Sequence, residues 1–381
     1  MRRFTAFYAL VICVLSGLAT ASPHLTIDLD SGRVLSQRQA FDVWHPASLT
    51  KLMTAYVAFN ALQSGEISPD DPVVISRLAS RQPPSKMGYG RGTVISVEDA
   101  LKLVIIKSAN DVSVALAETI AGSVDAFADQ MNAQASRLGM KDSRFVNPHG
   151  LHDARQVVTA HDLALLLQAL HKTYPQYREW FSAAGIRSQH RTKKKKIIER
   201  IHYSYNLLLE RYRGADGFKT GFVCASGYNF AGSATRAGRR IAAVVLGRDS
   251  QTTRAVDAAK LITQGFELPL TAGVPIEELT PDANRRTSPR NMRSVLCTPE
   301  ARAKRYEPGA GLAVIKSPWL GERIKQEITV RTVLQGNRKR RPVTIPTPRP
   351  QYTPPKPFEG GAQTAHRTVT LPTFRPSVGV N

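Results

Sequence analysis

The sequence predicts an α/β fold of the α+β kind, in which an antiparallel sheet is flanked by helices and a helical subdomain lies beside it. Strand-like apolar runs occur near the start of the chain, at Leu25–Leu29, and well after its middle, at Ile241–Leu246. Between them, apolar residues recur at helical spacing. Strands that enclose a helical middle in this way are typical of a sheet with helices packed against it.

The first predicted helix carries a serine and a lysine three residues apart. Pro46 suits the first helical position, and an apolar stripe predicts a helix that ends near Gly65. Residues at this spacing share a helix face, about 5–6 Å apart between Cβ atoms, so the Lys51 amine can reach the Ser48 hydroxyl. A lysine can remove the serine proton when burial or a second cation lowers its pKa.

A second polar motif, Ser108-Ala109-Asn110, is predicted in a short turn between two helices. Ser96, followed three residues later by an acid, marks the start of the first helix, and a new helical pattern runs from Asp111 to about Gly122. A turn held between helices presents its side chains rigidly, as a catalytic site requires. Ordinary capping by Ser and Asn would explain the same turn.

The third motif, Lys219-Thr220-Gly221, is predicted on a strand at the edge of the sheet. The strand Gly217–Phe222 precedes two further strands, Gly227–Gly232 and Ile241–Leu246, which favours antiparallel pairing. A lysine there can anchor a carboxylate and can also serve as the second cation beside Lys51, while the glycine lets the backbone of a bound peptide approach. A surface lysine in a hairpin would explain Lys219 on its own.

The start of the chain resembles that of an exported protein. Met1-Arg2-Arg3, an apolar run to Leu18 and then Ala19-Thr20-Ala21 predict a signal peptide over residues 1–21, with an uncleaved membrane anchor as the alternative. Secretion across the inner membrane and a periplasmic location, with peripheral membrane association left open, are therefore expected.

Three regions are expected after the signal peptide. A composition of 42% hydrophobic residues supplies a large core, and residues 22–267 are predicted to form one catalytic domain. Residues 268–334 form an extension of unknown fold, with a possible strand pair at Leu312–Ile315 and Glu327–Val330. Residues 335–381 combine prolines with basic residues, which predicts a disordered tail.

The formal net charge of +22 implies an anionic partner or a solvated basic surface. Much of the charge lies in the tail, and another part lies in the run Arg191–Lys196. Such runs suit anionic lipid or a cell-envelope polymer, and the tail in particular is expected to contact such a surface. An exported protein meets little nucleic acid, so no nucleic-acid partner is expected.

Cysteines and histidines indicate neither a metal site nor a cofactor. Cys13 lies in the predicted signal peptide, which leaves Cys224 and Cys297 either as a disulfide or as two unpaired thiols. His149 and His152 are three residues apart, but the proline and glycine around them would break a helix. No Cys/His cluster and no glycine-rich phosphate loop of specific spacing occurs, so no cofactor is expected.

The ordered motifs Ser-x-x-Lys, Ser-x-Asn and Lys-Thr-Gly resemble those of the penicillin-binding protein and serine β-lactamase superfamily. Over about residues 24–267 the chain is more similar to the low-molecular-mass D-alanyl-D-alanine carboxypeptidases. The resemblance is carried by the segments Pro46–Thr54, Ser108–Asp111, Phe145–Leu151 and Asp216–Gly221. It implies a β-lactamase/transpeptidase-like fold. It also implies a serine-type enzyme that removes the terminal D-Ala from peptidoglycan stem pentapeptides and binds β-lactam antibiotics.

The resemblance also implies a role for each motif residue. Ser48 attacks the carbonyl between the last two D-alanines and forms an acyl-enzyme, with Lys51 taking its proton. Ser108 relays a proton to the leaving D-Ala, and Asn110 hydrogen-bonds the substrate amide. Lys219 and Thr220 bind the terminal carboxylate. The implied catalytic residues are Ser48, Lys51, Ser108 and Asn110, and the implied substrate-binding residues are Lys219, Thr220, Gly221 and Phe222, whose backbone amide shares an oxyanion hole with that of Ser48.

Two positions depart from the family pattern. Phe222 stands where members often have His or Tyr, which leaves substrate preference open. Ser204-Tyr205-Asn206 stands where some relatives place an arginine between asparagines, which leaves carboxylate recognition there open.

Three other functions are alternatives to the carboxypeptidase. A DD-endopeptidase uses the same residues and cannot be separated by motif. A class A β-lactamase is disfavoured because no glutamate before the third motif, among those at positions 118, 179, 199 and 210, is followed four residues later by asparagine. A non-catalytic peptidoglycan-binding protein is disfavoured because every motif side chain is present.

Overall fold

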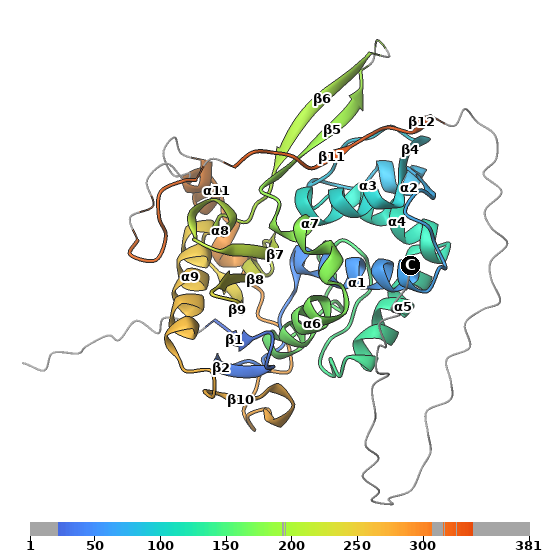
Figure 1. The fold of residues 1–381 in the computed structure, drawn as a ribbon. Coiled ribbons are helices and arrows are strands. Elements are labelled where there is room, and N and C mark those ends of the chain that lie inside the picture. Colours follow the sequence, from blue (N-terminus) through green and yellow to red (C-terminus); the bar gives the residue numbers. More distant parts are fainter. Residues whose placement is uncertain are drawn as a thin grey trace, which may run out of the picture. The chain divides into compact units, whose positions relative to one another are not determined.

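The structure is a computed structural model and describes residues 22–192, 194, 196–306, 315, 317–324 and 326–337. A six-stranded antiparallel sheet in the order β10-β2-β1-β9-β8-β7 runs through this part of the chain (Figure 1). Its strands are β1 (His24–Asp28), β2 (Arg33–Arg38), β7 (Ala215–Val223), β8 (Gly227–Arg236), β9 (Arg239–Arg248) and β10 (Val274–Pro275). The two predicted terminal strand patterns are thus neighbours, β1 and β9.

Strand β9 is buried on both faces because its side chains alternate between two hydrophobic cores. Ile241, Ala243 and Val245 belong to the smaller core, to which helix α9 (Gln251–Glu267) contributes. The even-numbered residues Ala242, Val244 and Leu246 belong to the larger core, to which helices α1 (Thr50–Gln63) and α6 (Ala160–Thr173) contribute. The sheet therefore lies between helices, as in the predicted α+β class.

Most helices lie in the chain segment between β2 and β7 (Figure 1). Among the described residues, helices before β7 are α1 (Thr50–Gln63), α2 (Arg77–Ser80), α3 (Val97–Lys102), α4 (Asn110–Ala121), α5 (Val124–Arg137), α6 (Ala160–Thr173), α7 (Arg178–Ser182) and α8 (Leu208–Arg211), with α10 (Arg293–Leu296) and α11 (Pro299–Tyr306) after α9. Helix α1 is buried on nearly all sides from Thr50 to Phe59, as the centre of a helical region requires.

Two three-stranded sheets are completed by the predicted extension and by the first residues of the predicted tail. Strands β5 (Gly185–Arg191) and β6 (Ile197–Tyr203) form a hairpin, and β11 (Arg331–Thr332) pairs in parallel with β5. Strands β3 (Pro72–Val74) and β4 (Thr93–Ser96) pair with each other, and β12 (Gly336–Asn337) joins β4. Residues 331–337 therefore connect the hairpin to the helical region.

The predicted extension strands differ from those observed. Glu327–Val330 does not form a strand; the strand begins one residue later, at Arg331, because pairing with β5 decides its position. Leu312–Val314, the greater part of the other predicted strand, lies outside the described residues. Gln335–Asn337, the first residues of the predicted tail, pair with β4, and the remainder of the tail lies outside the described residues, as does the predicted signal peptide.

Cys224 and Cys297 form a disulfide. It joins the turn after β7 to the end of α10, and the Met292 amide adds a 2.9 Å hydrogen bond to the Ala225 carbonyl in the same turn. The start of the extension is therefore held against the strand that carries the third motif. No helix in the described ranges combines the length and apolar character needed to cross a bilayer.

Candidate active site

The segment that carries Ser48, the candidate nucleophile, lies where the chain enters α1. Ser48 is in a 3-10 turn (Ala47–Leu49) that continues directly into α1, so Lys51 follows it by about one helical turn. The Lys51 amine lies 3.1 Å from Ser48 Oγ. The spacing of the first motif therefore produces the predicted contact between the Lys51 amine and the Ser48 hydroxyl.

Lys51 is only 1% exposed, and three oxygen atoms surround its amine. Nζ lies 3.1 Å from Ser48 Oγ, 2.8 Å from Asn110 Oδ1 and 2.6 Å from the His149 carbonyl oxygen. Burial and the charge of Lys219 hold the pKa of Lys51 well below its usual value, against the opposing charge of Asp111. A neutral amine would donate to Asn110 and His149 and direct its lone pair toward the Ser48 hydroxyl.

The position of the second motif depends on Ser108, whose backbone has a left-handed conformation. A π-helical turn (Leu103–Lys107) extends α3 and ends at Ser108, whose φ of 64° turns the chain into α4. Helix α4 begins at Asn110, one residue before the predicted start. Asn110 Oδ1 accepts from Lys51 and Nδ2 donates to the Pro83 carbonyl, which leaves a second Nδ2 hydrogen for a substrate carbonyl. Ser108 is 3% exposed, and its hydroxyl makes no hydrogen bond with a described residue.

The third motif lies on β7, the edge strand of the six-stranded sheet as described. Lys219 is buried, and its Nζ lies 3.3 Å from the Thr220 carbonyl oxygen. Burial, together with the charges of Arg254 and Lys107, lowers the pKa of Lys219 to about 7. An ammonium group in this position is partly desolvated and can pair strongly with an anion.

The structure gives a different reason for a glycine at position 221 from the one that the sequence suggested. A Cβ atom at Gly221 would lie 2.9 Å from the Ser48 amide nitrogen and 3.0 Å from the Pro46 carbonyl oxygen. The close neighbour is thus the protein's own nucleophile segment, and the absent side chain lets β7 pack against it. The prediction that this glycine makes room for substrate backbone is not needed to explain it.

The loop Asn147–Leu151 closes over the start of α1. A Cβ atom at Gly150 would lie 1.8 Å from the Ala47 carbonyl oxygen, and the φ of Gly150 is +84°, so a side chain is excluded on both counts. The Thr54 hydroxyl donates to the Pro148 carbonyl at 2.6 Å, and the next carbonyl, that of His149, meets Lys51. This loop therefore helps to bury the Lys51 amine.

His149 and His152 do not form a ligand pair. Burial and then the charge of Lys51 lower the pKa of His149 to about 3, and its Nδ1 accepts from the Leu151 amide. His152 instead packs edge-on against His45, with ring centroids 4.7 Å apart. Among the described residues, no group of three or more His, Cys, Asp or Glu side chains could hold a metal ion.

Asn229, on β8, was not identified from the sequence. Its Nδ2 donates to the carbonyls of His45 and Pro46 at 3.1 and 3.3 Å, and its Oδ1 accepts from the Gly247 amide on β9 at 2.8 Å. The side chain therefore attaches the chain before Ser48 to two central strands. Only the folded sheet brings these backbone atoms together, so no local pattern indicates the role.

Asn229→Ala is expected to slow acylation of Ser48 by penicillin about 10- to 100-fold, because the segment before the nucleophile loses its attachment to the sheet. Asn132→Ala is the matched control, since Asn132 likewise makes hydrogen bonds with backbone groups of a distant segment, at Phe145. Thermal unfolding should show comparable destabilisation in both variants. Equal acylation rates, measured well below both melting temperatures, would contradict the positioning role of Asn229.

Arg254 was also missed by sequence reasoning. It lies on α9, is 3% exposed, donates to the Tyr205 carbonyl at 3.1 Å and stacks over the Tyr228 ring. Its Nε has no hydrogen-bond partner among the described residues. In the segment where some relatives place an arginine, the Tyr205 hydroxyl instead contacts Lys107 Nζ at 3.1 Å. Arg254 thus brings a guanidinium close to Lys219 from a different element.

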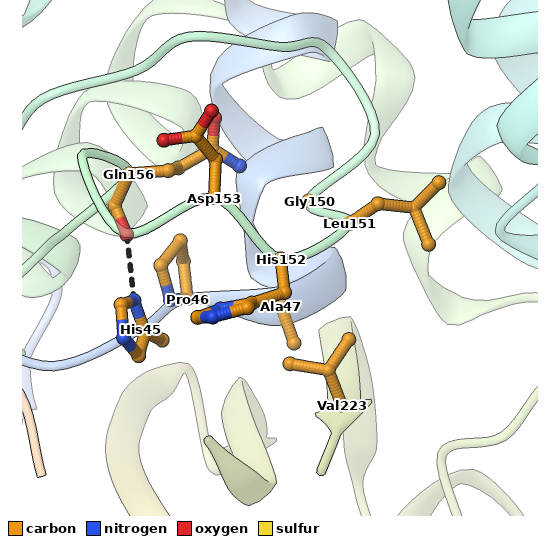
Figure 2. Close-up of a pocket in the computed structure, with 9 residues that line it drawn as sticks. All are labelled: His45, Pro46, Ala47, Gly150, Leu151, His152, Asp153, Gln156 and Val223. Carbon is orange, nitrogen blue, oxygen red and sulfur yellow. Dashed lines mark hydrogen bonds between the residues drawn. The ribbon is translucent and has the colours of Figure 1, made fainter. Parts of the chain in front are cut away.

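A shallow surface hollow adjoins the segment before Ser48 (Figure 2). Its lining residues are His45, Pro46, Ala47, Gly150, Leu151, His152, Asp153, Gln156 and Val223. The two imidazoles and the end of β7, at Val223, face this space in Figure 2. None of the motif side chains lines it, so the hollow flanks the reacting groups.

Comparisons with known proteins agree with this geometry. The family model described as D-alanyl-D-alanine carboxypeptidase, peptidase family S11, matches residues 17–250. D-alanyl-D-alanine carboxypeptidase DacD of Escherichia coli K12 is 35% identical over 256 residues, which cover 64% of this chain and 63% of that relative. The chain thus matches a little less than two thirds of this relative's length.

Two crystal structures show the same fold. That of D-alanyl-D-alanine carboxypeptidase DacD from Francisella tularensis is 29% identical with a TM-score of 0.62, and the match covers 68% of this chain and 74% of that one. Penicillin-binding protein D2 from Listeria monocytogenes, in its cefotaxime-bound form, is 33% identical with a TM-score of 0.56 over 65% of this chain and 97% of that one. The predicted β-lactamase/transpeptidase-like fold is confirmed.

The ordered motifs, their convergence around Lys51 and the match over residues 17–250 lead to one conclusion. The chain belongs to the D-alanyl-D-alanine carboxypeptidase family, peptidase family S11.

Proposed function

We propose that the protein is a serine-type D-alanyl-D-alanine carboxypeptidase that removes the terminal D-Ala from peptidoglycan stem pentapeptides. The observation that carries this proposal is the buried Lys51 amine, which lies between Ser48 Oγ and Asn110 Oδ1 and has a strongly lowered pKa. A base held in this way beside a serine suits nucleophilic attack on a carbonyl.

The proposed reaction begins when Ser48 Oγ attacks the carbonyl carbon between the last two D-alanines, while its proton passes to Lys51 Nζ. The backbone amides of Ser48 and Phe222 hold the resulting oxyanion. The carbon–nitrogen bond then breaks, and the leaving amine takes a proton relayed through Ser108. Water hydrolyses the acyl-enzyme and restores the Ser48 hydroxyl.

Substrate would bind as an extended peptide along β7. An edge strand offers main-chain hydrogen bonds to such a peptide. Lys219, with the Thr220 hydroxyl, would hold the terminal carboxylate, and the buried Arg254 would strengthen the positive field at this end of the site. Asn110 would use its second Nδ2 hydrogen to bind the substrate carbonyl.

The assay that tests the activity compares two substrates. The mature protein should release free D-Ala from a pentapeptide ending in D-Ala-D-Ala, and release should stop after prior treatment with penicillin. Cleavage of a crosslinked muropeptide dimer in preference to the pentapeptide would instead support a DD-endopeptidase. Rapid turnover of penicillin would support a β-lactamase, and no turnover of any of the three would support a non-catalytic binding protein.

The pH profile is expected to depend on Lys219. Its pKa of about 7 means that the cation is present below that pH and is lost above it, so kcat/KM should fall on the alkaline side of neutrality. Lys219→Arg, which stays charged, should move this limb to higher pH. An unchanged alkaline limb in this variant would contradict the assignment.

Lys219→Ala is expected to lower kcat/KM about 10- to 100-fold, because a hydrogen bond to a charged group contributes about 1.5–3 kcal/mol. Amidating the substrate terminus should lower kcat/KM of the wild type to the value that the Lys219→Ala variant has with the free acid. If the wild type has the same kcat/KM for both substrates, Lys219 does not bind the terminal carboxylate.

The location and regional organisation are also proposed. A cleaved signal peptide over residues 1–21 would export the chain to the periplasm, where residues 22–267 act as the catalytic domain and residues 268–334 as an extension attached to it. The basic residues of the tail, 335–381, would tether the enzyme to an anionic envelope surface. Deletion of residues 338–381 should weaken salt-sensitive binding to isolated envelope material and leave hydrolysis of small peptides unchanged.

A further inference from the structure

The hairpin of β5 and β6 exposes an apolar strand face of unusual composition. Successive side chains alternate along a strand, so Ile197, Ile201 and Tyr203 lie on the same face of β6. They are 47%, 40% and 53% exposed. Exposed apolar residues scattered singly are ordinary, but here they fill three of the four positions on one strand face, with Glu199 as the fourth, and this needs an explanation.

Cations flank this apolar face. In the hairpin register, Arg191 is opposite Ile197 and Arg187 is opposite Ile201. The acid on the same face, Glu199, is paired with Arg187 at 3.3 Å and so adds no net negative charge of its own. Arg191, which forms no ion pair with a described residue, therefore places positive charge at the Ile197 end of the apolar stripe.

The hairpin tip is strongly basic. The sequence from Arg191 to Lys196 contains five cations and no acid. Of these, Arg191, Lys194 and Lys196 are described and exposed, and none forms an ion pair with a described residue. Unpaired cations at one end of an exposed element create a local positive potential.

The hairpin also extends away from the rest of the described elements, as Figure 1 shows. Among the described residues, β11 covers one edge of β5, and β6 has no strand on its outer side. The tip can therefore approach a broad, flat surface without interference from the helices or from the six-stranded sheet.

We propose that the β5–β6 hairpin is a membrane-docking element that binds the surface of an anionic phospholipid bilayer. Lipid phosphates would attract Arg191, Lys194 and Lys196, while Ile197 enters the interfacial layer and Tyr203 lies nearer its polar side. A soluble polyanion would account for the cations but not for the exposed isoleucines. A bilayer surface offers a partner to both.

The test uses the full mature chain and a fluorescent reporter of burial. Ile197→Cys, labelled with an environment-sensitive dye such as NBD, should show a blue-shifted emission with vesicles of phosphatidylcholine and phosphatidylglycerol. It should show no shift with phosphatidylcholine alone. Lys172→Cys, labelled in the same way at an exposed position near the end of α6, should show no shift with either. Because the reporter senses position 197 itself, binding through the tail alone does not reproduce the result.

Two sets of variants separate charge from apolar contact. Replacing Arg191, Lys194 and Lys196 by Gln should weaken vesicle partitioning about 100-fold, since each cation near an anionic surface contributes roughly a factor of five. The matched control replaces the exposed Lys141, Lys172 and Lys260 by Gln and should bind as the wild type does. Ile197→Ser should also weaken binding at unchanged charge, whereas Leu270→Ser, at a residue that is 71% exposed, should not.

Three results would overturn the proposal. One is pelleting with anionic vesicles without an emission shift at position 197, which would assign binding to another part of the chain. Another is an equal shift with soluble polyphosphate, which would assign the hairpin to a polymer. The third is equal vesicle binding by the hairpin and control variants. Penicillin labelling of Ser48 should be normal in all hairpin variants, so that failure here is independent of the proposed enzymatic function.

Discussion

Penicillin is expected to form a lasting covalent adduct with the mature protein at Ser48, and Ser48→Ala is expected to abolish it. A β-lactam presents a strained amide where the scissile D-Ala-D-Ala bond would lie, and Ser48 Oγ is the hydroxyl that contacts the buried amine of Lys51. Loss of a serine nucleophile removes most of the rate enhancement of a hydrolase, so D-Ala release should fall by a factor on the order of 10⁴ or more.

Intact-mass measurement followed by peptide mapping locates the adduct. Ser64→Ala, at an exposed serine at the other end of the same helix, is the matched control and should label and hydrolyse as the wild type does. An adduct on any residue other than Ser48, or D-Ala release by a folded Ser48→Ala protein at more than a trace rate, would refute the assignment.

Lys51→Arg is expected to slow acylation by roughly 10²- to 10⁴-fold, the range that a positioned general base contributes. Arginine keeps the charge but does not lose its proton at any accessible pH, so it cannot accept the proton of Ser48. In the wild type, the lowered pKa means that the neutral base forms at a lower pH than for an ordinary lysine. Acylation should therefore rise with pH on the acid side of the profile, and this limb should be absent in the variant.

Stopped-flow acylation by a chromogenic cephalosporin, over a range of pH, measures both quantities. Lys260→Arg, at an exposed lysine on α9, controls for the exchange itself. Circular dichroism and thermal unfolding establish whether the larger side chain is accommodated. A folded Lys51→Arg protein with near-normal acylation, or with the wild-type acid limb, would exclude Lys51 as the base.

Much of the fold follows from local patterns. The antiparallel strands of the third motif, from Gly217 to Leu246, are confirmed as β7, β8 and β9, and the helix after Pro46 is confirmed as α1. Period-two and period-3.6 apolar patterns are readable here because each element buries a defined surface. The C-terminal region was harder to predict, since its short strands β11 and β12 exist only through pairing with β5 and β4. The two-residue sequences of these strands are too short to show an apolar repeat.

The disulfide illustrates the same limit. The sequence leaves Cys224 and Cys297 either paired or free, because two cysteines 73 residues apart can bond only if the fold brings their Cα atoms within range. In the structure these atoms are 5.8 Å apart, since α10 packs on the turn that follows β7. This distance depends on how the extension packs on the catalytic region. The spacing of the two cysteines along the chain does not predict that packing.

The candidate site divides in a similar way. The spacing of the first motif already predicts that Lys51 lies about one helical turn from Ser48, because helix geometry brings residues three apart to one face. The environment that suits Lys51 to act as a base arises only in the tertiary structure. The Lys51 amine meets Asn110 and the His149 carbonyl, which come from distant segments, and it is desolvated by the loop that contains Gly150. A pKa depends on burial and on nearby charges in space, and these contacts exist only once the chain has folded.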